Sequence, residues 1–428
     1  MTPVRGKTMS EKLLSRAAHA DLRAGDLAIC MPDAAMGTDG SIPMALDYLQ
    51  QMQEEGQDLP GPSHPDRIVF AFDHYGAGSS EKSLALQQRA RGYAVAYGVR
   101  IFEVGAGIGH QLMLEGGFVL PGQLVVGADS HAVSYGALNA FGTGIGSSDF
   151  AGVLQCSQVW LKVPAAIRLR LRGQLGPGVS AKDVALTLAR RLGADGANGL
   201  ALEFSGAGVA GLDMDDRIVL ANMSVELGAK AGIFPFDDRT AGYLNGRSPS
   251  IGAPVCADPD AAYAQTIELD LAEVRPQVAL PHRVDQVVDL DQAPATAIQM
   301  VYLGTCTGGR SKDFQEALEV LRDGGGIAPG VRLVVTPASE AVRDELLATG
   351  VLQEFESMGA EIQPPGCGAC CGTCGSIPAD GVNVVSTANR NFRGRMGNRE
   401  ARIFLASPRA CAAAAVLGRL GEPARVPA

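Results

Sequence analysis

Short runs of β-branched and aromatic residues recur along the chain and alternate with segments of helical apolar spacing. The runs are RIVFAF (67–72), VRIFEV (99–104), QLVV (123–126), QMVYLG (299–304), VRLVVTP (331–337) and VNVVST (382–387). Between the later runs, residues 312–323 and 339–349 space their apolar side chains as a helix does. The second of these segments opens on a capping serine and is closed by Gly350. This alternation predicts parallel βαβ units and therefore an α/β fold.

The chain is long enough for more than one packed core. It has 428 residues, of which 46% are apolar. The composition changes after Val163, where the alternating stretch IRLRLRG replaces a Gly-rich one, and it changes again in the proline-containing segment 275–294. We therefore predict three α/β domains, over residues 1–163, 164–282 and 283–428.

The charge balance restricts the partners that the chain can bind. There are 36 Lys and Arg residues against 46 Asp and Glu residues, for a net charge of −10. This balance argues against the broad basic surface that binds a phosphate backbone, so no nucleic-acid partner is expected. The first residues lack a signal-type apolar core, and no apolar run approaches the roughly 20 residues that span a bilayer. We expect a cytoplasmic protein without a membrane span.

Reactive side chains follow several of the predicted strands directly. They are Asp73 and His74 after 67–72, His110 after 99–104, Asp129 and His131 after 123–126, Cys306 after 299–304, and Asn389 and Arg390 after 382–387. In open α/β sheets, ligands bind beyond the carboxyl ends of the strands, where the loops converge. The sequence therefore predicts that these residues meet at one cleft.

The cysteines point to a metal site. Four of the nine, Cys367, Cys370, Cys371 and Cys374, fall within eight residues, and Cys306 stands alone after a strand. One interpretation places all four on a single metal such as zinc, and another treats them as chance cysteines in a Gly-rich turn. A third takes three thiolates from Cys306 and one CxxC pair, which leaves one iron of a four-iron cluster open as a Lewis acid. The neighbouring TCTGGR and NRNFRGR favour this third reading, because guanidinium groups clamp carboxylates.

Three of the six histidines, His74, His110 and His131, lie in post-strand loops near acidic residues. A single loop histidine is commonly just solvated, but three beside carboxylates indicate proton donors and acceptors. The Gly-rich stretches 104–110 and 141–149 do not fit a dinucleotide-binding pattern. We interpret them as tight turns, with Ser147, Ser148 or Asp149 capping the helix that follows.

Ordered landmarks over nearly the whole chain carry a family resemblance. They are FDHYG (72–76), GIGHQ (107–111), PGQLVVGADSHAVSYGALNAFGTGIGSSD (121–149), AKDV (181–184), LANMSVELGAK (220–230), YLGTCTGGR (302–310), PPGCGACCG (364–372) and STANRNFRGRMG (386–397). With these the chain resembles the aconitase superfamily, in its branch of large subunits of the two-subunit 3-isopropylmalate dehydratase type.

The resemblance implies three α/β domains packed around a [4Fe-4S] cluster, without the swivelling fourth domain. It implies cluster ligation by Cys306, Cys367 and Cys370, and no role for Cys371 and Cys374. It implies acid–base pairs of Asp73 with His74, Asp129 with His110, and Glu226 with His131. It implies substrate contacts from Asn389, Arg390 and Arg395.

The resemblance also implies a partner and a substrate class. Single-chain aconitases carry a GSSRE-type segment that supplies the serine base, and this sequence has none, so a separate small subunit is the expected partner. The expected substrate is a small 2- or 3-hydroxy diacid, with 3-isopropylmalate in leucine biosynthesis as the first choice. Tyr75, Ala132, Val133 and Gly308 depart from the commonest family pattern. These departures keep other reactions open, namely maleate or citraconate hydration and dimethylmalate or homoaconitase-type dehydration.

Two alternative functions belong to other classes of protein. One is a non-catalytic iron–sulfur or RNA-binding regulator, which the acidic balance and the complete acid–base set disfavour. The other is a zinc-binding structural protein that uses the four clustered cysteines. Metal analysis separates the zinc protein from the iron–sulfur enzyme.

Overall fold

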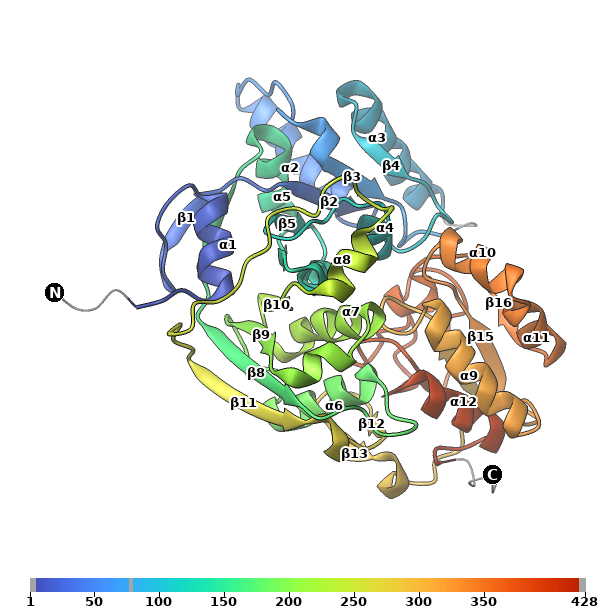
Figure 1. The fold of residues 1–428 in the computed structure, drawn as a ribbon. Coiled ribbons are helices and arrows are strands. Elements are labelled where there is room, and N and C mark those ends of the chain that lie inside the picture. The colour runs from blue at the N-terminus through green and yellow to red at the C-terminus, as the bar shows by residue number, and fades with distance from the viewer. Residues whose placement is uncertain (1–4, 77–79, 423–428) are drawn as a thin grey trace.

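The computed structural model describes residues 5–76 and 80–422 and shows the α/β fold that the sequence predicts (Figure 1). The first large sheet has five parallel strands in the order β4-β3-β2-β5-β6. Their bounds are β2 Ala34–Thr38, β3 Ile68–Ala71, β4 Arg100–Phe102, β5 Leu124–Gly127 and β6 Phe141–Gly144. The strand order reverses between β2 and β5. From β2 the chain adds β3 and β4 on one side of that strand, and it then adds β5 and β6 on the other side. Ligands bind at such a switch point in open α/β sheets.

Two smaller sheets follow. β1 (Leu27–Cys30) and β7 (Val159–Lys162) form an antiparallel ribbon. A four-stranded parallel sheet has the order β10-β9-β8-β11. Its strands are β8 Ala166–Arg172, β9 Ala201–Ser205, β10 Ala231–Ile233 and β11 Gln265–Asp270.

The last sheet has seven strands in the order β13-β12-β18-β17-β14-β15-β16. They are β12 Gln277–Ala279, β13 Val287–Asp289, β14 Met300–Leu303, β15 Arg332–Val335, β16 Glu361–Ile362, β17 Asn383–Ser386 and β18 Arg402–Ala406. Only the pairings of β12 are antiparallel. The strand order reverses between β14 and β17, and Tyr302 pairs with Ser386 there. The segments that leave these two strands therefore emerge side by side.

The division into three domains stays a prediction. The three predicted ranges contain, in order, most of the five-stranded, the four-stranded and the seven-stranded sheet. β12 and β13, however, lie on either side of the predicted boundary at residue 282 and belong to the same sheet. This pairing favours a boundary ahead of Gln277.

Helices cover the sheets. They are α1 Met9–Ala17, α2 Ile42–Glu54, α3 Glu81–Tyr97, α4 Gly109–Glu115, α5 Ser147–Cys156, α6 Ala181–Leu192, α7 Met214–Met223, α8 Asp238–Leu244, α9 Ser311–Asp323, α10 Glu340–Ala348, α11 Val351–Ser357 and α12 Pro408–Leu417. The segments predicted at 312–323 and 339–349 are confirmed as α9 and α10, and the Ser339 side chain accepts from Val342 N. The predicted cap of α5 is wrong. The N-cap is Gly146, and no side chain caps this helix because the turn places the serines inside it. In the described part of the chain, no helix is long and apolar enough to cross a membrane.

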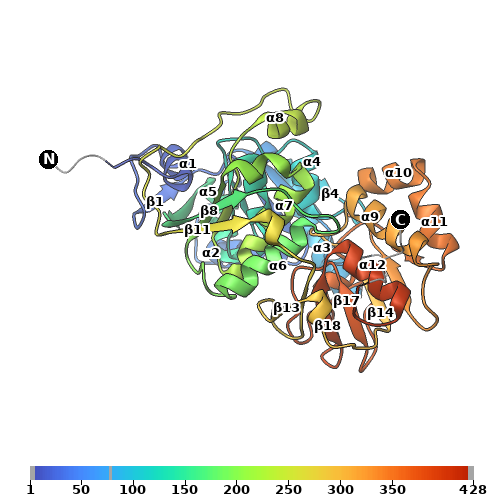
Figure 2. The same ribbon diagram turned by 60° about the horizontal axis from the view of Figure 1, so that its bottom comes forward.

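The five-stranded, four-stranded and seven-stranded sheets share a central core. In β14, Val301 and Leu303 pack with α9 and α12, whereas Met300 and Tyr302 face a cluster that also contains side chains of α6 and α7. β3 divides its side chains in the same way, with Val69 and Ala71 in that central cluster. Figure 2 shows α9 to α12 and β14, β17 and β18 gathered at one end of the molecule, with α6 and α7 near its centre. The sheets are thus fixed relative to one another, and the loops at their ends meet.

Candidate active site

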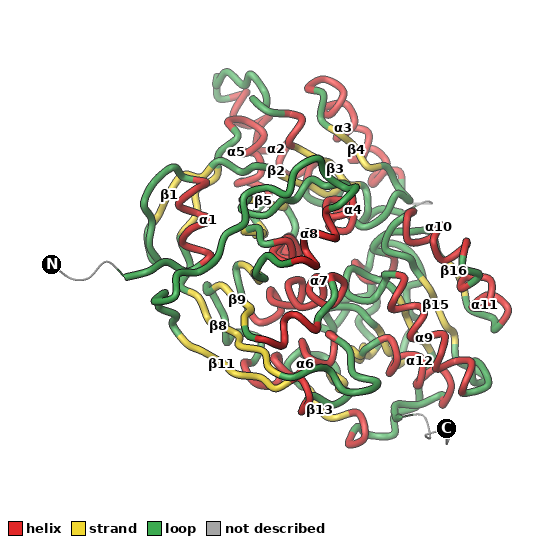
Figure 3. The backbone as a smooth tube through the Cα atoms, in the orientation of Figure 1, coloured by secondary structure: helices red, strands yellow, loops and turns green. Residues whose placement is uncertain are grey.

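A small cavity lies where loops of the five-stranded and seven-stranded sheets meet. Loops occupy the region between α4, α7 and α9 (Figure 3). The cavity is lined by Asp73, His74, Ile108, His110, Asp129, His131, Thr305, Cys306, Cys367, Cys370, Cys371, Asn389 and Arg395. All the residues predicted to converge except Arg390 therefore line one cavity. The convergence follows from the two switch points, since Asp129 comes after β5 and Cys306 after β14.

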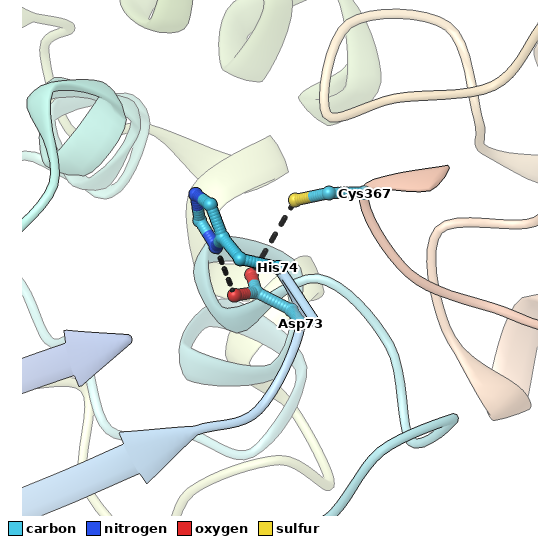
Figure 4. A group of neighbouring side chains, drawn as sticks. All are labelled: Asp73, His74 and Cys367. Atoms are coloured by element: carbon cyan, nitrogen blue, oxygen red, sulfur yellow. Dashed lines mark hydrogen bonds and ion pairs between the residues drawn. The ribbon is translucent and has the colours of Figure 1, made fainter. Parts of the chain in front are cut away.

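Asp73 and His74 form the first imidazole–carboxylate pair. His74 Nδ1 lies 2.6 Å from Asp73 Oδ1, and the other carboxylate oxygen accepts from Gly109 N at 2.8 Å. The same oxygen lies 3.6 Å from Cys367 Sγ, so the pair touches the cysteine loop (Figure 4). Asp39 accepts hydrogen bonds from His74 N at 3.0 Å. The backbone of His74 is thereby fixed, and the imidazole is oriented by its carboxylate.

Asp129 lies at the centre of the other histidines. Its Oδ1 lies 2.8 Å from His110 Nε2 and accepts from His131 N at 2.8 Å, and its Oδ2 lies 3.7 Å from His74 Nε2. His131 Nε2 in turn lies 3.1 Å from Glu226 Oε1. The three pairs that the resemblance implies are therefore in contact, whereas their chemical roles stay predictions.

The charges of this cluster stabilise one another. Burial alone lowers the pKa of His74, but the charge and hydrogen bond of Asp73, with the charge of Asp129, raise it to about 10. Burial acts to raise the pKa of Asp129, and the charges and hydrogen bonds of His110 and His131 hold it well below its usual range. These directions describe an ionised Asp129 beside a protonated His74. The arrangement holds a proton at the edge of the cavity.

The cysteines line the opposite side. Cys306 Sγ accepts from Asn222 Nδ2 and from Asn389 Nδ2, both at 3.2 Å, and Cys370 Sγ lies 3.8 Å from Asn389 Oδ1. Burial raises the pKa of Cys306 to about 12, and burial raises that of Cys367 well above its usual range. A buried thiol with so little tendency to ionise does so when it bonds to a metal.

The donor set fits an anionic metal–thiolate group. Four thiols line one cavity, two amides donate to the sulfur of Cys306, and Arg395 lies beside Cys370 with its Nη2 3.7 Å from Sγ. Arg395 Nε is buried and has no hydrogen-bond partner among the described residues. A donor left without a partner next to thiols indicates room for an anionic group.

Two predicted residues lie outside the cavity lining. Arg390 Nε donates to Glu226 at 2.8 and 3.0 Å, and its Nη2 donates to Ser130 Oγ at 2.9 Å. Glu226 and Arg390 therefore support His131 from behind it. Asn389 lines the cavity, but its amide nitrogen is used by Cys306 and Asn222. The predicted substrate contacts of Asn389 and Arg390 stay untested.

Sequence reasoning missed two residues next to Cys306. Asn222 donates to the sulfur, and Arg310 Nη2 donates to the carbonyl oxygen of Cys306 at 2.9 Å. Both lie in landmark segments, LANMSVELGAK and YLGTCTGGR, so a signal existed. The contact of Asn222 with the cysteine was hidden because 84 residues separate the two in sequence.

Cys371 and Cys374 contact the histidine loop. Their sulfurs are 4.0 Å apart, and Cys371 Sγ donates to His74 O at 3.5 Å. Thr373 Oγ1 donates to the same carbonyl at 2.6 Å. This end of the cysteine loop therefore helps to hold the His74 backbone.

Several relatives cover nearly the whole chain. The "3-isopropylmalate dehydratase large subunit 1" of Methanopyrus kandleri is 41% identical, over 98% of this chain and 99% of the relative. The "homoaconitase large subunit" of Thermus thermophilus is 41% identical over 98% and 97%, and the "2,3-dimethylmalate dehydratase large subunit" of Eubacterium barkeri 40% identical over 98% and 99%. The chain is therefore an enzyme of the hydro-lyase class.

The particular family is defined by a match along the chain. The aconitase family (aconitate hydratase) matches residues 11–298 and 291–418. The chain belongs to the aconitase family. This membership implies an iron–sulfur cluster. A solved structure, Thermococcus kodakaraensis aconitase X in its holo form, shares the fold with a TM-score of 0.50 and 14% identity, covering 85% of this chain and 84% of that one.

Proposed function

We propose that the chain is the large subunit of a [4Fe-4S] hydro-lyase that dehydrates and rehydrates a small 2- or 3-hydroxy diacid. One observation carries the proposal: thiols that include Cys306, Cys367 and Cys370 line the same cavity as the imidazole–carboxylate cluster. A hydro-lyase needs both a Lewis acid for the departing hydroxyl and a proton source beside it. The two requirements are met by the two sides of this cavity.

Cys306, Cys367 and Cys370 are the proposed cluster ligands. They come from two loops of the seven-stranded sheet, after β14 and after β16. When bound, a cluster with three cysteine ligands supplies one open iron that acts as a Lewis acid toward the substrate oxygens. Cys371 and Cys374 are left to hold the His74 loop, as their contacts indicate.

His74 is the proposed proton donor to the departing hydroxyl. Asp73 binds Nδ1, which leaves Nε2 on the side of Asp129 and the cavity. His110 and His131 keep Asp129 ionised, so the proton on His74 is stabilised from both ring nitrogens. The donor is thus charged and oriented before substrate enters.

Arg395 is the proposed carboxylate clamp on this chain. It lines the cavity, and its Nε has no partner in the described part of the chain. A guanidinium group with free N–H donors binds a carboxylate through two parallel hydrogen bonds. The local positive charge allows a chain of net charge −10 to bind a diacid.

The base that removes the carbon-bound proton is proposed to come from a separate small subunit. The relatives are named as large subunits, which supports such a partner here. The acidic charge balance gives no reason to add a nucleic-acid partner.

The proposed substrate is 3-isopropylmalate or a close relative. Relatives named for 3-isopropylmalate, homoaconitate and 2,3-dimethylmalate chemistry are 40–41% identical to this chain, so identity does not choose among them. Anaerobic co-expression with the cognate small subunit, followed by a substrate panel that includes maleate and citraconate, decides the question. We expect enoate absorbance in the ultraviolet to appear with one hydroxy diacid, and zinc in place of iron, or no turnover on any diacid, would contradict the proposal.

A further inference from the structure

Lys182 is buried among neutral oxygens. It is the second residue of α6, and its side chain is 1% exposed. Its Nζ donates to Thr307 Oγ1 at 2.7 Å and to the carbonyl oxygens of Thr387 and Ala388 at 2.7 and 2.9 Å. These bonds use all three N–H donors of the ammonium group. No carboxylate lies within 4.0 Å of Nζ among residues 5–76 and 80–422, which is unusual because a buried charge is costly without a charged partner.

The three acceptors belong to the two loops that carry the site. Thr307 directly follows Cys306, and Ala388 directly precedes Asn389. The loops are also joined to each other at this level, because Thr307 Oγ1 donates to Thr387 O at 2.8 Å. At their tips, Asn389 Nδ2 donates to Cys306 Sγ. Lys182 therefore binds both loops next to Cys306 and Asn389, and it is not among the residues that line the cavity.

The lysine is itself fixed by its helix. α6 belongs to the part of the molecule built on the four-stranded sheet, and Figure 2 shows it beside β13 of the seven-stranded sheet. The next residue, Asp183, caps the helix start at Ser180 and accepts from Gln277 N of β12 at 2.8 Å. The ammonium is thus held in place by a rigid element that comes from outside the cluster loops.

The charge of Lys182 is complementary to the cysteines. Burial lowers the pKa of Lys182 to about 8, and negative charge on Cys306 gives the largest opposing effect. A metal–thiolate group in the cavity would supply the negative charge that the neutral oxygens do not.

We propose that Lys182 is a positioning residue for the cluster site, which joins the Cys306 and Asn389 loops and places a positive charge behind the thiolates. This inference rests on the proposed function, since it assigns Lys182 a role toward the cluster. Residues that orient metal ligands are typically worth about 10- to 100-fold in metal affinity. The same charge also affects the cluster's reduction potential, because a nearby cation favours uptake of an electron.

The test compares Lys182→Met with Lys312→Met in protein reconstituted anaerobically with iron and sulfide. Lys312 is the matched control. It is a lysine of α9 that binds the start of α7, at Asp213 (2.7 Å) and Asp216 (2.9 Å), away from the cysteines. We expect Lys182→Met to release iron to a chelator about 10- to 100-fold faster than wild type, and its cluster to have a more negative midpoint potential. Lys312→Met should match wild type in both measurements.

A second variant keeps the proposal testable if Lys182→Met does not fold. Thr307→Val retains the ammonium and removes one acceptor, so iron release should accelerate while the midpoint potential stays near that of wild type. The proposal is overturned if Lys182→Met, or Thr307→Val where Lys182→Met does not fold, releases iron no faster than Lys312→Met does. It is also overturned if Lys312→Met shows the same changes as Lys182→Met. Absence of iron from the wild type would overturn the proposed function itself, so the two failures are distinguishable.

Discussion

The two sides of the cavity differ in how complete they are. On the side of the five-stranded sheet, His74, His110 and His131 each contact a carboxylate, and charges of opposite sign stabilise one another. On the side of the seven-stranded sheet, Cys306 is buried and Cys367 half-buried, and the ionisation of both thiols is strongly disfavoured. The acid–base side is therefore preformed by the chain alone, whereas the thiol side requires a bound cation to complete it.

Loss of a thiol should have the largest effect, because it removes the group on which the thiol side depends. Cys306→Ser, Cys367→Ser and Cys370→Ser are each expected to abolish turnover and to lower the iron content measured after anaerobic purification. Cys374→Ser, in the same loop, is the control and should keep both iron and turnover. Loss of activity in Cys374→Ser alone would mean that the ligand assignment is wrong.

His74→Gln should separate the two sides. We expect kcat to fall by about 10²- to 10⁴-fold, since a positioned general acid contributes that much, while the iron content stays at the wild-type level. His64→Gln, which changes an exposed histidine, is the matched control. A His74→Gln protein without iron would show that the acid–base side is needed to build the thiol side.

Arg395→Lys tests the residue that contacts both the thiols and the free space. Lysine keeps the charge but cannot form two parallel hydrogen bonds to a carboxylate, so kcat/KM should fall by about 10- to 100-fold. The loss should appear mainly in KM if the clamp acts equally in the ground and transition states. Unchanged steady-state kinetics would place the carboxylate clamp elsewhere.

Tyr135→Phe should have the smallest effect. The Tyr135 hydroxyl lies 3.3 Å from His110 Nδ1, a long contact on the complete side. Because such a hydrogen bond is worth roughly 1 kcal/mol, kcat should fall by no more than about ten-fold. A larger loss, measured in steady-state assays, would mean that the histidine cluster is less preformed than its contacts indicate.

The sequence predicted which residues form the site better than it predicted which of them contact one another. Asp73 and His74 could be placed at a sheet edge because they follow a strand directly, and Cys306 likewise. The strand order could not be derived from the sequence, although it brings β14 next to β17 and so joins the Cys306 and Asn389 loops. The pair of His131 and Glu226 was available only from the family resemblance, since 95 residues separate its members.

Residues that act through others were the hardest to foresee. Asn222, Arg310 and Lys182 all lie in segments that were recognised as landmarks, yet nothing in their spacing indicates that they support Cys306. Arg390 illustrates the reverse case: its sequence context predicts a substrate contact, while the structure pairs its side chain with Glu226. Long-range partners decide what such residues do, and a sequence alone does not show them.

The most direct test is Mössbauer spectroscopy of ⁵⁷Fe-reconstituted protein, together with its small subunit, before and after addition of a hydroxy diacid. An incompletely ligated cluster predicts one iron whose signal changes when the diacid is added, while the signals of the three thiolate-bound irons stay the same. Four iron sites that do not respond to any diacid, or a protein that takes up zinc and no iron, would contradict the account.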